Sequence, residues 1–426
     1  MQPGERLRLT VEKPAAGGRM IARHDGAIVL VSGAIPGESV EAVVERQQRG
    51  TVWARTTAVL EPSPDRLEDE HDSACGGNVL AHVRYERQLA LKIDIIRDAF
   101  TRIGRCALPD DVPIEPSPRD GYRMRARLHV QRGQIGFYRE GTHSLCDAAA
   151  TGQLLPATVD TLRALEQEIG RLPGIDGAEL ELAENIPASE RVAHILLPRP
   201  ALGPSMRALP AIAGLTGLSA SVPTSLNVRV IAGDTTLHDT LEVASARGVL
   251  AVTLERQAHA FFQGNRFLLA PLAQAVSDVV PRDRVLDLYA GVGLFAVTLA
   301  ARGDTSVTAI EGDRTSAADL KANAAQCGRA VDPRHQPVEV FLRATKPGAF
   351  ATVMVDPPRT GMSKEALGGA IALNAHRIVY VSCDVATLAR DARMLVDVGY
   401  RLTSVRAFDL FPNTAHVETL AVFDRT

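Results

Sequence analysis

Four apolar stretches toward the C-terminus each run into small or polar residues that would end a strand. They read VLDLYAG, SVTAIEG, ATVMVDPP and RIVYVSCD, and helical stretches such as TSAADLKANAAQCG separate the earlier ones. Buried strands that alternate with helices predict a doubly wound sheet, whose ligands bind at the carboxyl ends of the strands. We therefore expect residues 261–426 to form an α/β domain with its chemistry just after these strands.

The rest of the chain divides into two further regions. Residues 1–62 contain short β-rich runs punctuated by glycines, such as LRLTVEK and AIVLVSG, and they predict a small β-barrel. Residues 63–260 mix several strands with a helix near 159–169, which predicts a central α+β domain. Helical spacing of apolar residues predicts another helix within 85–103, which could pack with the C-terminal domain. We thus expect a multidomain protein.

Composition limits where and on what such a protein acts. The net charge of -3 gives no global attraction to nucleic acid, so any nucleic-acid surface must come from local clustering of arginines. The first residues lack an apolar signal region, and no apolar stretch is long enough to cross a membrane. The five cysteines form no CxxC pair. These features predict reduced thiols and a cytoplasmic location without membrane contact.

A glycine motif follows the first of the four strands. Asp287 begins the motif DLYAGVG, in which Gly291 and Gly293 would allow a sharp turn and a close approach of the backbone to a ligand. Glu311 ends the next strand, about 20 residues later, where an acidic residue can bind ribose hydroxyls. The motif resembles the first motif of class I S-adenosylmethionine methyltransferases. The alternative is a packing turn followed by an incidental glutamate.

Three polar residues follow or begin the later strands. Asp356, in DPPR, would be held at the mouth of the crevice by two prolines, although a proline-rich strand exit is the alternative. Cys383 ends RIVYVSC, and a single cysteine is more often a small buried hydrophobic residue than a nucleophile. Glu418 is a carboxylate in an otherwise uncharged stretch, suited to be a base of raised pKa or a salt-bridged strand residue. His416, two residues earlier, is a weaker candidate base.

Together these motifs resemble the RNA uracil-5 methyltransferase family. LDLYAGVG, FFQGN, DPPRTGM, YVSCDVATLARD and FDLFPNTAHVET stand in the family's order, and AGGRMIARHDG with GAIPGESV is similar to the OB-like TRAM domain of its ribosomal RNA branch. The resemblance implies a Rossmann-like class I methyltransferase domain that uses S-adenosylmethionine. It also implies Cys383 as the nucleophile that adds to carbon 6 of uracil and Glu418 as the base that removes the carbon 5 proton. The residues implied around the cofactor are Gln263, Tyr289, Gly291, Glu311 and Asp356.

The sequence departs from the family pattern at three places. Of four cysteines that bind an iron–sulfur cluster in many members only Cys75 is present, with Asp69, Asn78 and Thr151 at the other places, so we expect neither a cluster nor another metal. Leu294 replaces an asparagine, which removes one polar contact to the cofactor. Asp384 follows the catalytic cysteine, where a negative charge would raise the thiol pKa unless Arg359 offsets it.

The stretch GYRMRARLHVQRGQIGFYRE carries the arginines that could bind RNA. Arg123, Arg125 and Arg127 alternate with apolar residues, which predicts a strand with one cationic face that turns near Gly133 into a second strand. A target base must leave the RNA stack to reach a buried thiol, and such substrates are held by arginines and aromatic platforms. The alternative is a solvated hairpin face.

We therefore expect an enzyme that methylates carbon 5 of a uridine in RNA, in ribosomal RNA rather than tRNA, and that acts as a monomer. Two alternatives stay open at this point. One is a non-catalytic RNA-binding protein that keeps the fold, and the other is a methyltransferase acting on an amino nitrogen. The second alternative needs neither Cys383 nor Glu418.

Overall fold

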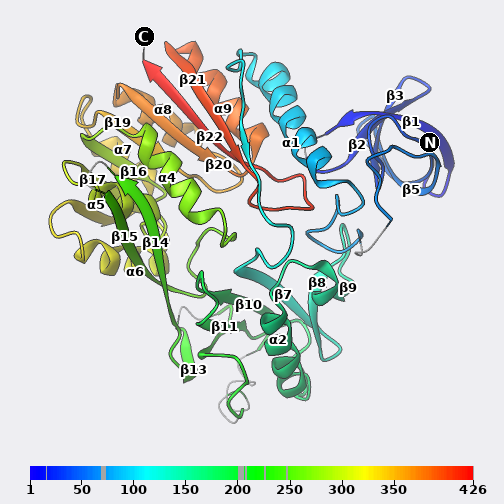
Figure 1. The fold of residues 1–426 in the computed structure, drawn as a ribbon, viewed down its shortest axis with the longest axis horizontal. Helices are drawn as coiled ribbons and strands as arrows, with labels where there is room; N and C mark the ends of the chain where they lie inside the picture. The colour runs from blue at the N-terminus through cyan, green and yellow to red at the C-terminus, as the bar shows by residue number, and fades with distance from the viewer. Residues whose placement is uncertain are drawn as a thin grey trace.

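The structure is a computed structural model that describes residues 1–15, 17–68, 73–199, 206, 209–224, 227–245 and 248–425. The N-terminal strands form a separate body on one side of the molecule, and the C-terminal sheet with its helices occupies the other side (Figure 1). A central sheet lies below both of them in this view. The predicted multidomain architecture is thus confirmed.

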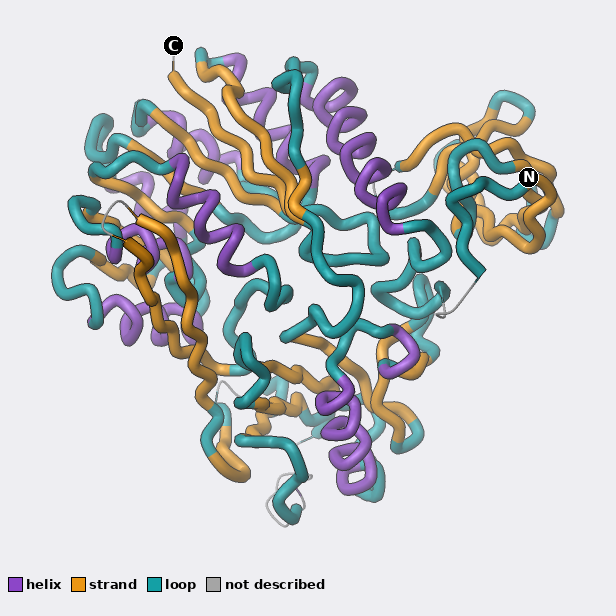
Figure 2. Tube along the Cα trace, viewed as in Figure 1, coloured by secondary structure: helices purple, strands orange, loops and turns teal. Residues whose placement is uncertain are grey.

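The N-terminal strands form a closed barrel, and alternate residues of a strand point into it and out of it. Strand β1 shows this pattern, with Leu7, Leu9 and Val11 buried and their neighbours exposed. The barrel appears as an all-strand body in Figure 2. Its order is β1 (Arg6–Pro14), β2 (Met20–His24), β3 (Ala27–Ser32), β5 (Thr51–Glu61) and β4 (Ser39–Gln48).

The central region is a seven-stranded sheet with helix α2 (Pro156–Ile169) packed into its core. Pro156 begins α2 at the position where a missing N–H costs nothing. The predicted turn lies at Arg132 and Gly133, both with positive φ. The strand order is β13 (Arg229–Gly233), β12 (Gly217–Ser221), β11 (Arg191–Leu196), β10 (Glu179–Glu184), β7 (Arg125–Gln131), β8 (Gln134–Tyr138) and β9 (Leu145–Asp147).

The C-terminal sheet is parallel in its first five strands and gains an antiparallel pair, β22 and β21, beyond β20. Its edge is β6, which pairs with the end of β21. The order is β18 (Val331–His335), β17 (Ser306–Glu311), β16 (Arg284–Leu288), β19 (Thr352–Val355), β20 (Arg377–Ser382), β22 (Glu418–Arg425), β21 (Tyr400–Phe408) and β6 (Ile114–Glu115).

Helices cover both faces of this sheet, and each face has its own apolar core (Figure 2). One core contains helices α4 (Leu269–Val279), α5 (Leu294–Ala301) and α6 (Arg314–Ala325). The other contains α1 (Tyr85–Ala99), the π-helical turn η1 (Phe100–Gly104), α7 (Val338–Ala344), α8 (Lys364–Ala372) and α9 (Val385–Asp397). The predicted doubly wound arrangement is confirmed.

Two segments that the sequence-based division assigns to the central domain pack with the C-terminal sheet. Residues 85–115 supply α1, η1 and the edge strand β6. The hairpin of β14 (Thr236–Ser245) and β15 (Gly248–Gln257) buries Leu241, Val243 and Leu254 in the core beside α4. None of the described helices is long and apolar enough to cross a membrane.

The expectation that the thiols are all reduced is wrong for two of them. Cys75 and Cys146 form a disulfide that joins the segment after the barrel to β9. The two cysteines are 71 residues apart, so their spacing carried no signal. With the Cys75 sulfur in this bond, and with an amide at Asn78 and a hydroxyl at Thr151, the donors do not fit an iron–sulfur cluster. Asp69 lies outside the described residues.

Candidate active site

The loop after β16 turns sharply at the carboxyl edge of the sheet. Tyr289, Gly291 and Gly293 all have positive φ, and Gly293 precedes the first residue of α5. A Cβ on Gly291 would lie 3.7 Å from the carbonyl oxygen of Phe261, an ordinary van der Waals contact, so the positive φ rather than crowding favours glycine here. The backbone N–H of Gly291 donates to Oε2 of Glu311 over 2.8 Å. The predicted turn and its acidic residue are therefore brought together.

Carboxyl groups surround this turn. Burial raises the pKa of Asp287 well above its usual value, and the nearby Asp356 and Glu311 raise it further. Burial also raises the pKa of Glu311, and it raises that of Asp356 to about 7. A site with several desolvated carboxyls has a negative potential once they ionise, which favours a cationic ligand.

Gln263 reaches this cluster from the FFQGN segment. Its Nε2 donates to Oδ2 of Asp356 over 3.3 Å. The segment itself continues the strand ladder of the central sheet, because the N–H of Met124 donates to the carbonyl of Gly264 and that of Arg266 to the carbonyl of Tyr122. The predicted cofactor residues thus converge at the junction of the central and C-terminal sheets.

Cys383 comes directly after β20, and Glu418 begins the antiparallel neighbour β22. The register pairs Ser382 with Thr419, so the next position along the ladder sets Cys383 beside Glu418. Burial raises the pKa of the Cys383 thiol to about 12, and the charges of Glu418 and Asp356 also raise it. Arg359 acts in the opposite direction through its charge and a hydrogen bond to the thiol.

Glu418 is 2% exposed. Burial raises its pKa well above the usual value, as does Asp356, whereas Arg359 lowers it. Among the described residues its Oε1 has no hydrogen-bond partner. A buried carboxyl with a free oxygen beside a thiol can accept a proton from a group placed between them.

The two departures near the site have structural roles. Asp384 is the N-cap of α9, and its Oδ1 accepts from the N–H of Thr387 over 2.8 Å. The groups that raise the thiol pKa are Glu418 and Asp356, so this carboxylate is directed into the helix cap. Leu294 begins α5 and packs in the apolar core. Burial lowers the pKa of His416 to about 4, which leaves a neutral ring near neutral pH.

A buried ion pair that the sequence did not reveal supports the loop before Glu418. Lys92 of α1 donates to Oδ1 of Asp409, and both side chains are fully buried. Tyr85 donates to the other oxygen of Asp409 over 2.8 Å, and Lys92 also donates to the carbonyl of Phe411. A lysine on a helix more than 300 residues away gave no pattern that could have identified it.

The segment with Arg123, Arg125 and Arg127, named here the arginine strand, has a less cationic face than predicted. Arg125 and Arg127 lie on one face of β7, as expected, but they pair with Glu181 and Glu179 of the neighbouring strand β10. Arg123 contacts aromatic rings, with its guanidinium carbon 5.6 to 5.8 Å from three ring centroids, those of Tyr122, Phe137 and Phe411. The face therefore carries compensated arginines and one arginine among aromatic residues.

Comparison with solved structures defines the class. The chain matches the structure of the Pyrococcus abyssi tRNA (uracil-54, C5)-methyltransferase in complex with S-adenosyl-L-homocysteine, with a TM-score of 0.75. The match covers 97% of this chain and 99% of that chain, at 24% identity. This match shows the fold of a class I methyltransferase, which here carries the glycine turn after β16 and Glu311 at the end of β17.

Sequence comparison defines the family. The TRAM domain description matches residues 1–56, and the tRNA (Uracil-5-)-methyltransferase description matches residues 344–426. Two relatives are the 23S rRNA (uracil(1939)-C(5))-methyltransferases RlmD of Methylococcus capsulatus and Alkalilimnicola ehrlichii, each 33% identical over 99% of this chain. These matches cover 98% and 97% of the relatives. The chain belongs to the RNA uracil-C5 methyltransferase family.

Proposed function

We propose that this protein methylates carbon 5 of a uridine in 23S ribosomal RNA, with S-adenosylmethionine as the methyl donor. The uridine is the equivalent of the position 1939 that names the two bacterial relatives. The single observation that carries the proposal is the register of β20 and β22, which sets Cys383 beside Glu418 at the edge that also holds the glycine turn. The enzyme acts as a monomer in the cytoplasm.

The crevice fits the donor. S-adenosylmethionine supplies an electrophilic methyl group on a positively charged sulfur. The carboxylate of Asp356 favours that charge once it ionises, and Gln263 fixes its orientation beside the buried Asp287. Glu311 accepts hydrogen bonds from the N–H groups of Gly291 and Asp313, and it can accept further hydrogen bonds from ribose hydroxyls. Tyr289 lies on the same turn as Gly291.

Cys383 activates the uracil ring of the substrate. Its thiolate adds to carbon 6 of uracil, and the electrons of the carbon 5–carbon 6 double bond move onto the carbon 4 carbonyl as an enolate. Carbon 5 then becomes nucleophilic and takes the methyl group. Arg359, the cation beside the thiol, lowers the free energy of the thiolate and so assists its formation.

Glu418 completes the reaction as the base. Its carboxylate removes the carbon 5 proton, the double bond re-forms, and the bond between carbon 6 and sulfur breaks to release the Cys383 thiolate. Burial makes this carboxylate a stronger base than an exposed one, because its pKa is raised. The free Oε1 is the atom available for the proton.

The RNA contacts the arginine strand. The target uridine leaves the stack to reach Cys383, and Arg123, with its three aromatic neighbours, suits an unstacked base or its phosphate. Arg125 and Arg127 contact phosphates after exchange of their glutamate partners. The TRAM barrel binds a more distant segment of the same RNA.

A fluorinated substrate tests the proposal. Incubation with cofactor and 23S ribosomal RNA containing 5-fluorouridine should give a protein–RNA adduct that survives denaturation, because fluorine at carbon 5 cannot leave as a proton. The adduct should require the cofactor and disappear in Cys383→Ala, while Cys106→Ala, a change at another free cysteine, should retain it. Absence of the adduct with intact RNA binding would refute the mechanism.

A second variant separates the two catalytic roles. Glu418→Gln should form a methylated adduct with ordinary uridine RNA, because addition and methyl transfer proceed but the proton stays on carbon 5. The measurement is radiolabel from the methyl group on a denaturing gel. Label transferred to RNA by Cys383→Ala at the wild-type rate would instead indicate methylation of an amino nitrogen.

A further inference from the structure

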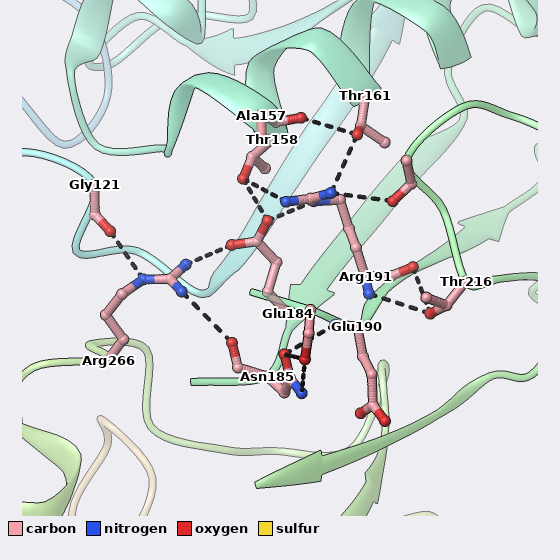
Figure 3. A network of polar contacts seen from close by, with 12 residues as sticks. Gly121, Ala157, Thr158, Thr161, Glu184, Asn185, Glu190, Arg191, Thr216 and Arg266 are labelled. Carbon is pink, nitrogen blue, oxygen red and sulfur yellow. Dashed lines mark hydrogen bonds and ion pairs between the residues drawn. The ribbon is translucent and has the colours of Figure 1, made fainter. Parts of the chain in front are cut away.

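A buried carboxylate joins the central sheet to the cofactor crevice. Glu184, the last residue of β10, is 1% exposed and binds two arginines, one through each carboxylate oxygen (Figure 3). Arg191 donates to Oε1 over 2.5 Å, and Arg266 donates to Oε2. The hydroxyl of Thr158 also donates to Oε1. Such charge-assisted bonds are stronger and more directional than neutral ones.

The two arginines belong to different parts of the molecule. Arg191 lies on β11, and its guanidinium also donates to Thr158, Thr161 and the carbonyl of Gly214, all within the central domain. Arg266 follows the FFQGN segment directly, three residues after Gln263. Its Nε donates to the carbonyl of Gly121 over 2.9 Å and its Nη1 to that of Ile186 over 2.8 Å.

The same segment is held on its other side by fixed groups. The fully buried Arg256 lies over the ring of Phe262, 4.4 Å from its centroid, and donates to the carbonyl of Glu184. Asn265 donates to Ser117 over 2.9 Å and to the carbonyl of Leu410 over 3.0 Å. The residues on both sides of Gln263 are therefore anchored.

We infer that Glu184 and Arg266 are positioning residues that set the place of Gln263, and through it of Asp356, in the cofactor crevice. The inference rests on the cofactor role proposed above for Gln263. The planar guanidinium of Arg266 makes its bonds to Glu184, Gly121 and Ile186 in one plane, so it fixes the backbone direction of the segment. The carboxamide of Gln263 is then preorganised for its bond to Asp356.

The test compares two lysine substitutions that each remove one guanidinium from the same carboxylate. In Arg266→Lys the Kd for S-adenosylhomocysteine, measured by calorimetry, should rise about tenfold, because a lysine cannot make the three planar bonds. In Arg191→Lys that Kd should stay within about twofold of wild type, since none of the hydrogen bonds of the Arg191 side chain in the described part of the chain reaches residues 261–266. Both variants should have a lower melting temperature than wild type. If both lose stability but only Arg266→Lys binds the ligand more weakly, the change in Kd is not a general effect of destabilisation.

The outcomes are distinct. Equal Kd values in wild type and both variants would overturn the inference, and so would equal weakening in both variants. A wild-type protein that does not bind S-adenosylhomocysteine would overturn the proposed cofactor, and the inference with it. If Arg266→Lys does not fold, Glu184→Gln, which keeps the side-chain volume, replaces it, and an unchanged Kd in that variant counts against positioning. The KM for the cofactor should rise in Arg266→Lys while RNA affinity stays unchanged.

Discussion

The side chain of Cys383 lies between groups that act on its charge in opposite directions. Burial, Glu418 and Asp356 raise its pKa to about 12, and Arg359 lowers it. Near neutral pH the thiol therefore holds its proton, and the thiolate forms only when a substrate or a shifted cation stabilises it. A protonated resting thiol reacts slowly with oxidants and other electrophiles, which protects the nucleophile between turnovers.

Arg359→Gln should slow alkylation of Cys383 by iodoacetamide about fivefold at pH 8, because loss of the cation raises the thiol pKa further. The wild-type rate should rise about tenfold per pH unit from pH 7 to 9, as expected for a thiol that titrates above this range. Peptide mass spectrometry gives the rate at each cysteine. Cys106 is the internal control, and a variant that alkylates Cys383 at the wild-type rate would contradict the argument.

The raised pKa of Asp356 should make cofactor binding depend on pH. With a pKa of about 7, the carboxyl is neutral below this pH and negative above it. Affinity for the sulfonium cation of S-adenosylmethionine should therefore rise between pH 6 and 8, by up to about tenfold per unit below the pKa. S-adenosylhomocysteine, whose sulfur is neutral, should show a smaller slope, and Asp356→Asn should flatten the first slope. Identical slopes for the two ligands in calorimetry would exclude this role.

At the scale of elements, α9 begins two residues after Cys383 and depends on a side-chain cap. Asp384 accepts from the N–H of Thr387, so Asp384→Ala should lower the free energy of unfolding by about 1 kcal/mol. Asp384→Asn keeps an accepting oxygen and should cost less. Urea unfolding gives both values. Faster alkylation of Cys383 in Asp384→Asn would show that the carboxylate acts on the thiol rather than on the helix.

The strands that carry the site were predictable because each apolar run is followed directly in the sequence by the residues that end the strand. Each apolar run ends in residues to which we assign the chemistry, and a doubly wound sheet brings such ends to one edge. The pairing that sets Cys383 beside Glu418 was not predictable from the sequence. Strand β22 joins the sheet antiparallel to β20 after a loop, and the register between the two strands brings the residues together. The resemblance to the family supplied the role of Glu418, and periodicity did not.

For the arginine strand, the sequence predicted the arrangement of the side chains but not their ion-pair partners. The alternation of arginines with apolar residues predicted which side chains share a face, and this agrees with the burial along β7. The neutralising acids, Glu179 and Glu181, come from a strand more than 50 residues later, and sequence spacing does not report cross-strand partners.

At the scale of the whole molecule, the disulfide closes a long loop between the barrel and the central sheet. The Cys75–Cys146 bond spans 71 residues, and a loop of that length corresponds to about 4 kcal/mol of lost unfolded-state entropy. Cys146→Ser, or reduction with a dithiol, should lower the melting temperature, whereas Cys327→Ser should not. Alkylation of the unreduced, denatured protein should label three cysteines, and labelling of all five would disprove the bond.

Domain membership was the least predictable property at this scale. Residues 85–115 and the β14–β15 hairpin are flanked by central-domain sequence on one side, yet they complete the C-terminal sheet and its core. For the helix within 85–103 the sequence analysis allowed packing with the C-terminal domain, as the structure has it, whereas the apolar residues of β14 and β15 do not indicate their partner. Only the three-dimensional packing resolves this choice.

The position of α1 has a consequence for the synthesis of the chain. Lys92 leaves the ribosome 317 residues before Asp409, the carboxylate that neutralises it in the folded protein. At about 5–20 residues per second, the helix waits roughly 15–60 s for its partner. Until then, the ammonium group and the part of the apolar face that contains Ile96 and Ala99 lack their partners, whereas Leu91 and Ile95 can already pack against the barrel. Chaperones can therefore bind this exposed surface of α1 while the rest of the chain is being made. The C-terminal sheet is complete only after its last strands have been synthesised.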